Sequence, residues 1–275
     1  MKRYLRILRA HPRPIRFLVG RGLAVSGLCR FLTIKQRGYR VRFHRSNLSE
    51  QLWLNRGCRD DALELFRAYL KPGDTVIDVG ANIGDVALTA SMAVGPTGRV
   101  WAVEAHPRTF RFLRANLRLN GVTNVEAINC AVGDAPGEIS FTDGRRDDMN
   151  RVGNGLLRVP IQRLDDLVAF RGPITLLKVD VEGFEKPVFS GAPAILKRTH
   201  CVHFEISRTH FSWFGYGICD LLLLLESSGF TLFRPESNGR LRTVDVRHET
   251  DGVENLIGLR STPEFMERTR WEIVY

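Results

Sequence analysis

The chain has 275 residues, 44% of them hydrophobic, so it can bury one sizeable core, and we expect one domain with an N-terminal appendage. Its five cysteines are scattered and form no Cys-x-x-Cys pair, which argues against a disulfide framework and a zinc site and favours a reducing, cytoplasmic compartment. The formal net charge of +10 is unevenly placed, since residues 1–49, here called the basic arm, contain 13 Lys or Arg and no Asp or Glu.

The basic arm precedes a predicted folded domain of residues 50–275. The stretch 18–34 is rather apolar, but Arg21 and Arg30 interrupt it, and a membrane-spanning helix needs ~20 consecutive apolar residues. The stretch also lacks the cleavage pattern of a signal peptide. An interfacial basic helix fits better, with residues 1–45 contacting an anionic membrane surface. Packing on the domain or on a partner, a targeting role and nucleic-acid binding are alternatives, although no aromatic-rich RNA-binding motif supports the last.

The first core strand is predicted at 75–79, after an edge strand at 39–44 and a helix at 60–70. Its β-branched apolar residues are typical of a strand that is buried on both faces. The strand runs into an acidic, glycine-punctuated turn, Asp78-Val-Gly-Ala-Asn-Ile-Gly84, and an apolar helix is predicted at 85–94.

This turn reads Asp-x-Gly-x-x-x-Gly, the usual opening of a site for S-adenosylmethionine (SAM). Gly80 and Gly84 would let a cofactor approach the backbone, because a side chain there would block it. The competing dinucleotide motif, Gly-x-Gly-x-x-Gly, is absent. We expect Asp78 to project its carboxylate toward the site, where it would repel a pyrophosphate but suit a sulfonium or an ammonium group.

A second acid, Glu104, lies on the next predicted strand, 98–105, and follows the glycine turn by ~20–25 residues. At this spacing in a doubly wound fold, an acid hydrogen-bonds the ribose hydroxyls of an adenosine. Two ordered signals on consecutive strands therefore favour a SAM site. Its expected cofactor-binding residues are Asp78, Gly80, Ala81, Asn82, Gly84, Glu104, Ala105, Ala131 and Asp180.

The remaining pattern continues to alternate between strands and helices, which predicts an α/β fold with a mainly parallel, doubly wound sheet. Ligands of such sheets bind at the carboxyl ends of the strands. A polar loop at 144–158 and the segment 207–217 are expected to frame the acceptor. The predicted elements are a helix at 108–120, strands at 125–132, 137–141 and 159–161, a helix at 164–170, a strand at 174–180, a helix to about 197, a strand at 201–206, a helix at 221–225, and strands at 230–234, 241–246 and 255–259.

Four motifs together resemble the FkbM family of SAM-dependent methyltransferases, and the resemblance covers residues 70–260. They are Asp78-Val-Gly-Ala-Asn-Ile-Gly84, Asn116-Leu-x-Leu-Asn120, Leu-Asp-Asp at 164–166, and Lys178-Val-Asp-Val-Glu-Gly-Phe-Glu185. The resemblance implies a class I methyltransferase (Rossmann-like) fold, a seven-stranded sheet whose last strand is antiparallel. It also implies O-methylation of hydroxyls on sugars, glycolipids or other small molecules. The chain has Glu104-Ala-His-Pro107 where similar family members often have Glu-Pro, but the acidic ribose position is kept.

Methyl transfer to an alcohol needs an oriented acceptor and a base. Asp180, at the end of the fourth core strand, is the leading candidate: it could contact the methionine ammonium, act as the base, or help to bind Mg²⁺. Glu182 and Glu185 could share one face of the next helix, near its N-terminal dipole. His203 and Glu205 alternate along the fifth strand and could be base and orienter, or metal ligands. The candidate catalytic residues are Asp180, Glu182, Glu205 and His203, with His210 as a further base.

The sequence therefore predicts a SAM-dependent O-methyltransferase that acts on a small-molecule or glycan acceptor, with a divalent metal as an open question. Two other interpretations stay open. One is RNA or protein methylation on the same fold, although the chain lacks the Asn-Pro-Pro-Tyr-type motif that clamps a planar amino group. The other is a SAM-binding, membrane-associated scaffold without turnover.

Overall fold

In the computed structural model, residues 13–144, 150–153, 155–236 and 239–274 are described. Their main sheet has the order β14-β12-β11-β13-β10-β9-β3-β4-β5. The five strands from β10 to β5 are parallel, and β13 runs antiparallel to β10 on one side and to β11 on the other. The strand bounds are β3 Thr75–Val79, β4 Arg99–Val103, β5 Val125–Ile128, β9 Ile174–Val179, β10 Thr199–Ser207, β11 Thr231–Glu236, β12 Arg240–Thr243, β13 Val253–Leu259 and β14 Glu272–Val274.

The seven strands from β5 to β11 confirm the predicted sheet: it is mainly parallel, and β13, the last of the seven in the chain, is antiparallel. The additional strand β14 continues the edge beyond β12 and pairs with it in parallel. The sequence did not predict β14, which is only three residues long.

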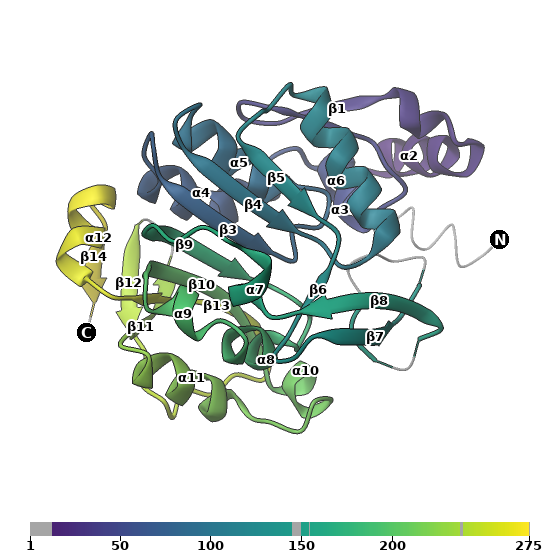
Figure 1. Cartoon of the computed structure of the whole chain (residues 1–275). Coiled ribbons are helices and arrows are strands. Elements are labelled where there is room, and N and C mark those ends of the chain that lie inside the picture. The colour runs from purple at the N-terminus through teal and green to yellow at the C-terminus, as the bar shows by residue number, and fades with distance from the viewer. Residues whose placement is uncertain (1–12, 145–149, 154, 237–238, 275) are drawn as a thin grey trace.

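Helices cover both faces of this sheet (Figure 1). All five residues of β3 are buried, and alternate side chains serve the two cores: Val76 packs with the helices of one face, and Ile77 with those of the other. A strand covered on both faces needs the continuous apolar run that the sequence has. One face carries α4 Asp60–Tyr69, α5 Asp85–Val94, α6 Pro107–Leu119 and α12 Thr262–Thr269; the other carries α7 Leu164–Leu167, α8 Glu185–Ser190, α9 Pro193–Leu196 and α11 Ile218–Ser227.

Two predicted elements are each divided in the structure. The strand predicted at 125–132 separates into β5 and β6 (Ala131–Val132), because the Asn129 amide between them donates to the carbonyls of Glu104 (2.8 Å) and Ala105 (3.0 Å). The chain thus leaves the main sheet, and β6 joins a three-stranded sheet with β8 (Leu157–Gln162) and β7 (Gly137–Phe141).

The helix predicted to run to about residue 197 is broken between α8 and α9 at Gly191. A Cβ at this glycine would lie 1.9 Å from the carbonyl oxygen of Gly133, so the backbone can only pass there without a side chain. A further short helix, α10 (Arg208–Ser212), follows β10 directly and was not predicted.

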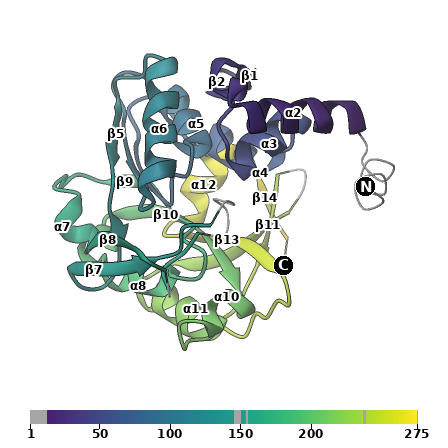
Figure 2. The same cartoon turned by 90° about the vertical axis from the view of Figure 1, so that its right-hand side faces the viewer.

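The N-terminal segment adds α2 (Pro14–Ser26), a 3₁₀ turn η1 (Leu28–Phe31), a hairpin of β1 (Thr33–Lys35) and β2 (Arg40–Arg42), and α3 (Asn47–Leu54). The strand predicted at 39–44 therefore lies in its own two-stranded sheet and not at the edge of the main one. Val41 and Phe43 are fully buried in the core that α4 to α6 share, whereas α2 lies over the outside of the body (Figure 2). Among the helices described, we find none with the length and apolar character needed to cross a membrane. The domain boundary after residue 49 stays a prediction.

Candidate active site

A cavity of about 260 Å³ opens where β3, β4 and β9 end at their carboxyl edges. Within the described part of the chain, its wall contains most of the residues predicted to bind the cofactor, whereas Asp78, Ala81 and Gly84 are not in the wall. Of the predicted catalytic residues, it contains three carboxylates but not His203. The predicted residues that line it are Gly80, Asn82, Glu104, Ala105, Ala131, Asp180, Glu182 and Glu205.

Glycine is required at position 80 because two strand ends meet there. Gly80 has φ +79°, and a Cβ on it would lie 1.9 Å from the carbonyl oxygen of Asp180. The turn after β3 can thus reach the end of β9 only with hydrogen at this position. Asn82, in the same turn, lines the cavity, and its Oδ1 is buried with no hydrogen-bond partner among the described residues. An unpaired acceptor at this place fits a ligand that carries hydroxyl or ammonium donors, as SAM does.

Glu104 is held at the cavity by two backbone amides. Its Oε2 accepts from the N–H of Asn82 (2.9 Å) and its Oε1 from the N–H of His106 (2.8 Å). Burial raises the pKa of this carboxyl to about 7, an effect that the two amide bonds oppose. The acid is thereby fixed beside the turn, as expected for a group that accepts hydrogen bonds from ribose hydroxyls.

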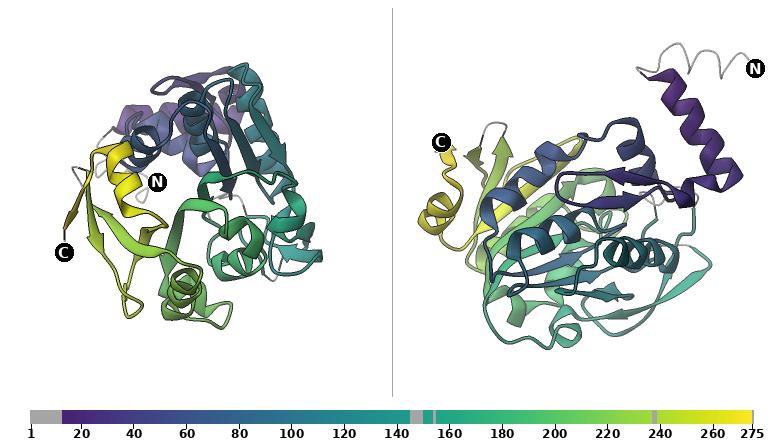
Figure 3. Two further views of the ribbon diagram at one scale, coloured as in Figure 1. Left: turned by 60° about the vertical axis from the view of Figure 1, so that its left-hand side comes forward. Right: turned by 90° about the horizontal axis from the view of Figure 1, so that it is seen from above.

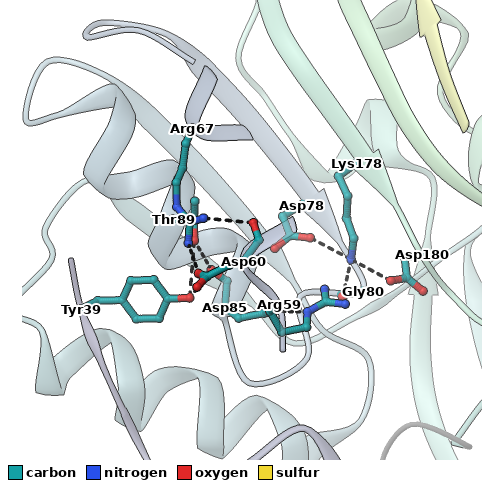
Figure 4. A network of polar contacts seen from close by, with 10 residues as sticks. All are labelled: Tyr39, Arg59, Asp60, Arg67, Asp78, Gly80, Asp85, Thr89, Lys178 and Asp180. Carbon is teal, nitrogen blue, oxygen red and sulfur yellow. Dashed lines mark hydrogen bonds and ion pairs between the residues drawn. The ribbon is translucent and has the colours of Figure 1, made fainter. Parts of the chain in front are cut away.

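Asp78 does not project into the cavity, which corrects the prediction made from the turn. Its side chain is fully buried, and its Oδ1 lies 3.1 Å from the Nζ of Lys178, which is paired with it across β3 and β9 (Figure 4). The same ammonium lies 3.6 Å from Oδ2 of Asp180 and donates to the carbonyl of Gly80 at 2.8 Å. Burial alone would lower the pKa of Lys178, but Asp78 and Asp180 together raise it above its ordinary value. Lys178 therefore ties the cofactor turn to the end of β9.

A second ion pair supports the turn from the other side. The Arg59 Nε lies 3.0 Å from Oδ2 of Asp85, the first residue of α5, and the hydroxyl of Tyr39 donates to the Asp85 carbonyl (Figure 4). An acid in the first turn of a helix is favoured by the helix dipole. Arg59, which directly precedes α4, also lines the cavity. It therefore contributes a guanidinium group to the wall of the site.

Two carboxylates and one imidazole gather beyond Asp180. The Nδ1 of His210 lies 3.6 Å from Oε2 of Glu182 and 3.6 Å from Oε1 of Glu205. Burial, with added repulsion from Asp180 and Glu182, raises the pKa of Glu205 to about 9, so this carboxyl is protonated at neutral pH. Burial lowers the pKa of His210, and Arg151 lowers it further. The imidazole is therefore neutral at pH 7.

The prediction that Glu182 and Glu185 share one helix face is wrong. Glu182 lies in the turn before α8, with φ +54°, whereas Glu185 is fully buried and accepts from the N–H groups of Val181 (2.9 Å) and Gly183 (3.4 Å). The two glutamates do not share a helix face, since Glu185 closes the turn that carries Glu182. His203 lies away from the first cavity.

A second cavity, of about 950 Å³, adjoins the first. Both cavities share Arg59, Val86, Lys178, Asp180 and Glu205 in their walls. His203 and Glu205 both face the second cavity, as the alternation of β10 predicts, although burial lowers the pKa of His203 to about 4 and its ring lies 5.1 Å from that of Phe66. Apart from Arg37, between β1 and β2, the other lining residues come from α4 and the antiparallel edge of the sheet: Asp60, Asp61, Ala62, Glu64, Leu65, Phe66, Arg234, Pro235, Glu236, Gly239, Glu254, Asn255 and Trp271.

Of the two segments expected to frame the acceptor, one contributes described residues to a cavity. Of the loop 144–158, Asn150 and Val152 line the first cavity, and residues 145–149 and 154 are outside the described part of the chain. No described residue of 207–217 lines either cavity.

The strand order, the glycine turn after β3 and the ribose-type acid after β4 together define a class I SAM-dependent methyltransferase. The chain belongs to the FkbM methyltransferase domain family, whose model matches residues 78–232.

Known proteins of this class are similar in sequence to part of this chain. It is 33% identical to the "31-O-demethyl-FK506 methyltransferase FkbM" of Streptomyces tacrolimicus, over 44% of this chain and 60% of that protein. It is also 33% identical to a Saccharolobus solfataricus protein named "Probable cobalt-precorrin-6B C(15)-methyltransferase (decarboxylating)", over 34% of this chain and 46% of that protein. The chain thus spans about half the length of these curated relatives. The crystal structure of Methyltransferase FkbM from Methylobacillus flagellatus KT matches 77% of this chain and 54% of its own, with 17% identity and a TM-score of 0.48.

Replacing Glu104 by Ala should weaken SAM binding by about 10- to 100-fold, because the two ribose hydroxyls of SAM would lose the carboxylate that accepts their hydrogen bonds. Isothermal titration with SAM and with S-adenosylhomocysteine measures both affinities. Glu126→Ala, an exposed acid on the neighbouring strand β5, is the matched control and should bind both ligands as the parent does. Equal affinities for the parent and the Glu104 variant would refute this placement of the ribose.

Replacing Glu205 by Gln should raise the melting temperature at pH 8 by a few degrees and change little at pH 4. The folded-state pKa of Glu205 is raised to about 9. A raised pKa gives stability that is complete below the unfolded value, near 4.3, and that is lost as the pH rises toward 9. Gln resembles the protonated carboxyl and does not titrate, so it escapes this loss. Thermal melts of both proteins between pH 4 and pH 9 test it; a constant difference across the range would contradict the assignment.

Proposed function

We propose that this protein transfers the methyl group of SAM to a hydroxyl oxygen of a sugar, a glycolipid or another small polyhydroxylated molecule. The observation that carries the proposal is the shared wall of the two cavities, where Asp180 and Glu205 face both. If SAM occupies the first cavity, an acceptor in the second reaches the same two carboxyl groups. Because Glu205 is protonated at neutral pH, Asp180 is the proposed base.

The first cavity suits SAM in the chemistry of its walls. Glu104 would accept hydrogen bonds from the ribose hydroxyls, and the buried, unpaired Oδ1 of Asn82 would accept one from the methionine ammonium. When bound, SAM supplies a methyl group on a sulfonium. The residues of the chain would bind and orient SAM and the acceptor, and Asp180 would take the proton of the acceptor hydroxyl. The products are a methyl ether and S-adenosylhomocysteine.

The second cavity suits an acceptor rich in hydroxyl groups. Its wall combines side chains of both charges, such as Arg234 and Glu254, with the amide of Asn255 and the ring of Trp271. Such a wall offers donors and acceptors at many places and an aromatic face for the apolar side of a sugar ring. The relative named for 31-O-demethyl-FK506 supports oxygen as the methylated atom, whereas the relative named a C(15)-methyltransferase keeps carbon as the alternative.

We also propose that Glu182, Glu205 and His210 can bind a divalent metal ion, and this part of the proposal is tested separately. Glu182, Glu205 and His210 each offer one ligand atom, and these atoms lie within 4.8 Å of one another. Carboxylate oxygens suit Mg²⁺, and imidazole suits transition metals. Assays in the presence of EDTA, and after adding back Mg²⁺ or Mn²⁺, decide whether the group acts as a metal site or only through hydrogen bonds.

The proposal is tested with labelled SAM and a panel of sugar, glycolipid and polyketide-like acceptors, with RNA and protein as further arms. Transfer to a hydroxyl that yields a methyl ether supports it, and transfer to RNA or protein supports the alternative enzyme. SAM binding without transfer to any acceptor, with and without metal, would instead favour a scaffold. Failure to bind SAM at high micromolar concentration would contradict all three.

A further inference from the structure

Among the described contacts, the packing of Gly20 and two hydrogen bonds to backbone carbonyls hold the helix α2 (Pro14–Ser26) on the body. Gly20 is buried against Trp53, and a Cβ there would lie 2.7 Å from the Trp53 ring. The indole Nε1 of Trp53 donates to the carbonyl of Arg16 (2.9 Å), and Nη2 of Arg45 donates to the carbonyl of Val25 (2.9 Å). These bonds fix the rotation of the helix about its axis. The side turned away from the body is therefore a defined surface.

This outward side of α2 is apolar. At about 100° per residue, Ile15, Leu18 and Val25 fall on the face opposite the buried Gly20, and Val19 lies at the side of this face. Their exposed fractions are 77%, 47%, 47% and 76%. The 3₁₀ turn η1, which follows α2 after Gly27, adds two exposed apolar side chains, Leu28 at 54% and Phe31 at 67% exposure. Scattered apolar residues on a surface are normal, but six exposed large apolar side chains within residues 15–31 mark an interaction site.

The segment that carries this face is rich in basic residues. The 13 Lys or Arg of residues 1–49 have no acidic residue among them, while the rest of the chain carries 27 basic and 30 acidic residues. Arg30 lies against the ring of Phe31, with its guanidinium carbon 4.8 Å from the ring centroid. At the start of the helix, Arg13 and Arg16 flank a hollow of about 430 Å³ that is otherwise lined by apolar side chains: Pro14, Ile15, Val19 and Trp53. Figure 3 shows α2 extending from the body, so this segment can approach a flat surface.

We propose that the outward face of α2 and η1 binds the surface of an anionic lipid bilayer. The exposed apolar side chains enter the boundary between head groups and acyl chains, and the arginines around them pair with the lipid phosphates. An exposed apolar face, on a segment whose only charged residues are Lys and Arg, matches this partner in both respects. A second protein molecule would match the apolar part but would need an acidic rim, and a nucleic acid would leave the apolar part exposed. The proposal is independent of the acceptor and of catalysis.

Co-sedimentation of the full chain with vesicles tests the proposal. The vesicles are phosphatidylcholine alone or with about one third phosphatidylglycerol. We expect binding to the anionic vesicles at least about tenfold tighter than to the neutral ones, and a decrease as the salt concentration rises. The triple change Ile15→Ser, Leu18→Ser and Val25→Ser should weaken binding by about 100-fold or more, because apolar burial drives the insertion. Arg30→Glu with Lys35→Glu should weaken it by a factor of about five or more for each charge.

The matched control changes two residues of similar exposure on other elements. Leu223, on α11, is 47% exposed and Val253, on β13, is 53% exposed, so Leu223→Ser with Val253→Ser should leave vesicle binding unchanged. Titration with SAM shows whether each variant keeps its folded cofactor site. Equal binding to neutral and anionic vesicles, no binding to either, or equal losses in the triple variant and the control would overturn the proposal. So would a dimer that the triple variant converts to a monomer, or binding to single-stranded RNA without binding to vesicles.

Discussion

Replacing Asp180 by Asn should lower kcat by about 10²- to 10⁴-fold, the range that a positioned general base contributes. Asp180 lines both cavities, and its side chain is 34% exposed, so it can contact an acceptor in the second cavity. Asn keeps the shape of the side chain but cannot accept the proton of the hydroxyl. The rate at saturating SAM and acceptor, in single-turnover conditions, measures the effect on the chemical step.

The same variant separates the two roles that were open for Asp180. If the carboxylate binds the methionine ammonium instead, the Kd for SAM rises and kcat at saturation changes little. Glu205→Gln is the control, because this carboxyl is already protonated at neutral pH and Gln resembles that form. We expect it to keep kcat within about threefold at pH 7. A large loss in Glu205→Gln together with a small one in Asp180→Asn would assign the base to Glu205.

The parts of the site that the sequence predicts are those determined by local chain geometry. The glycines of the turn are needed within a few residues of one strand end, and Glu104 is bound by the amides of Asn82 and His106, which are near it in the chain or in the adjacent turn. Because these constraints act between residues that are close in the chain, they appear in the sequence as short motifs. Burial on both faces likewise leaves a continuous apolar run, which is why the central strands could be predicted.

The parts that the sequence does not reveal depend on contacts between distant segments. Asp78 and Lys178 are 100 residues apart and meet only because β3 and β9 are neighbours in the sheet. The signal was present, since a lysine inside the apolar strand 174–179 needs an anionic partner, but the pattern does not say which acid provides it. His210 likewise joins Glu182 and Glu205 only through the unpredicted helix α10.

Replacing Lys178 by Met should lower the free energy of unfolding by about 3–5 kcal/mol, because the change leaves Asp78 as a buried charge without its partner. The Asp78 side chain is fully buried, and Lys178 is the only cation that the described ion pairs give it. In the folded variant, burial favours the protonated form of Asp78, so the folded-state pKa of this carboxyl lies above the unfolded value near 3.9. The loss should therefore be small at pH 4 and grow as the pH rises toward neutrality.

The double variant Lys178→Met with Asp78→Asn decides whether the lost stability comes from the unpaired charge. Removing both charges should recover most of the loss at pH 7, since an uncharged pair carries no buried ion. Denaturant unfolding of the parent, both single variants and the double variant gives the coupling energy directly. A double variant as unstable as Lys178→Met alone would mean that the lysine stabilises the fold through packing and its bond to the Gly80 carbonyl. In that case both variants would lack the bond that joins the turn to β9, and SAM affinity should fall equally in both.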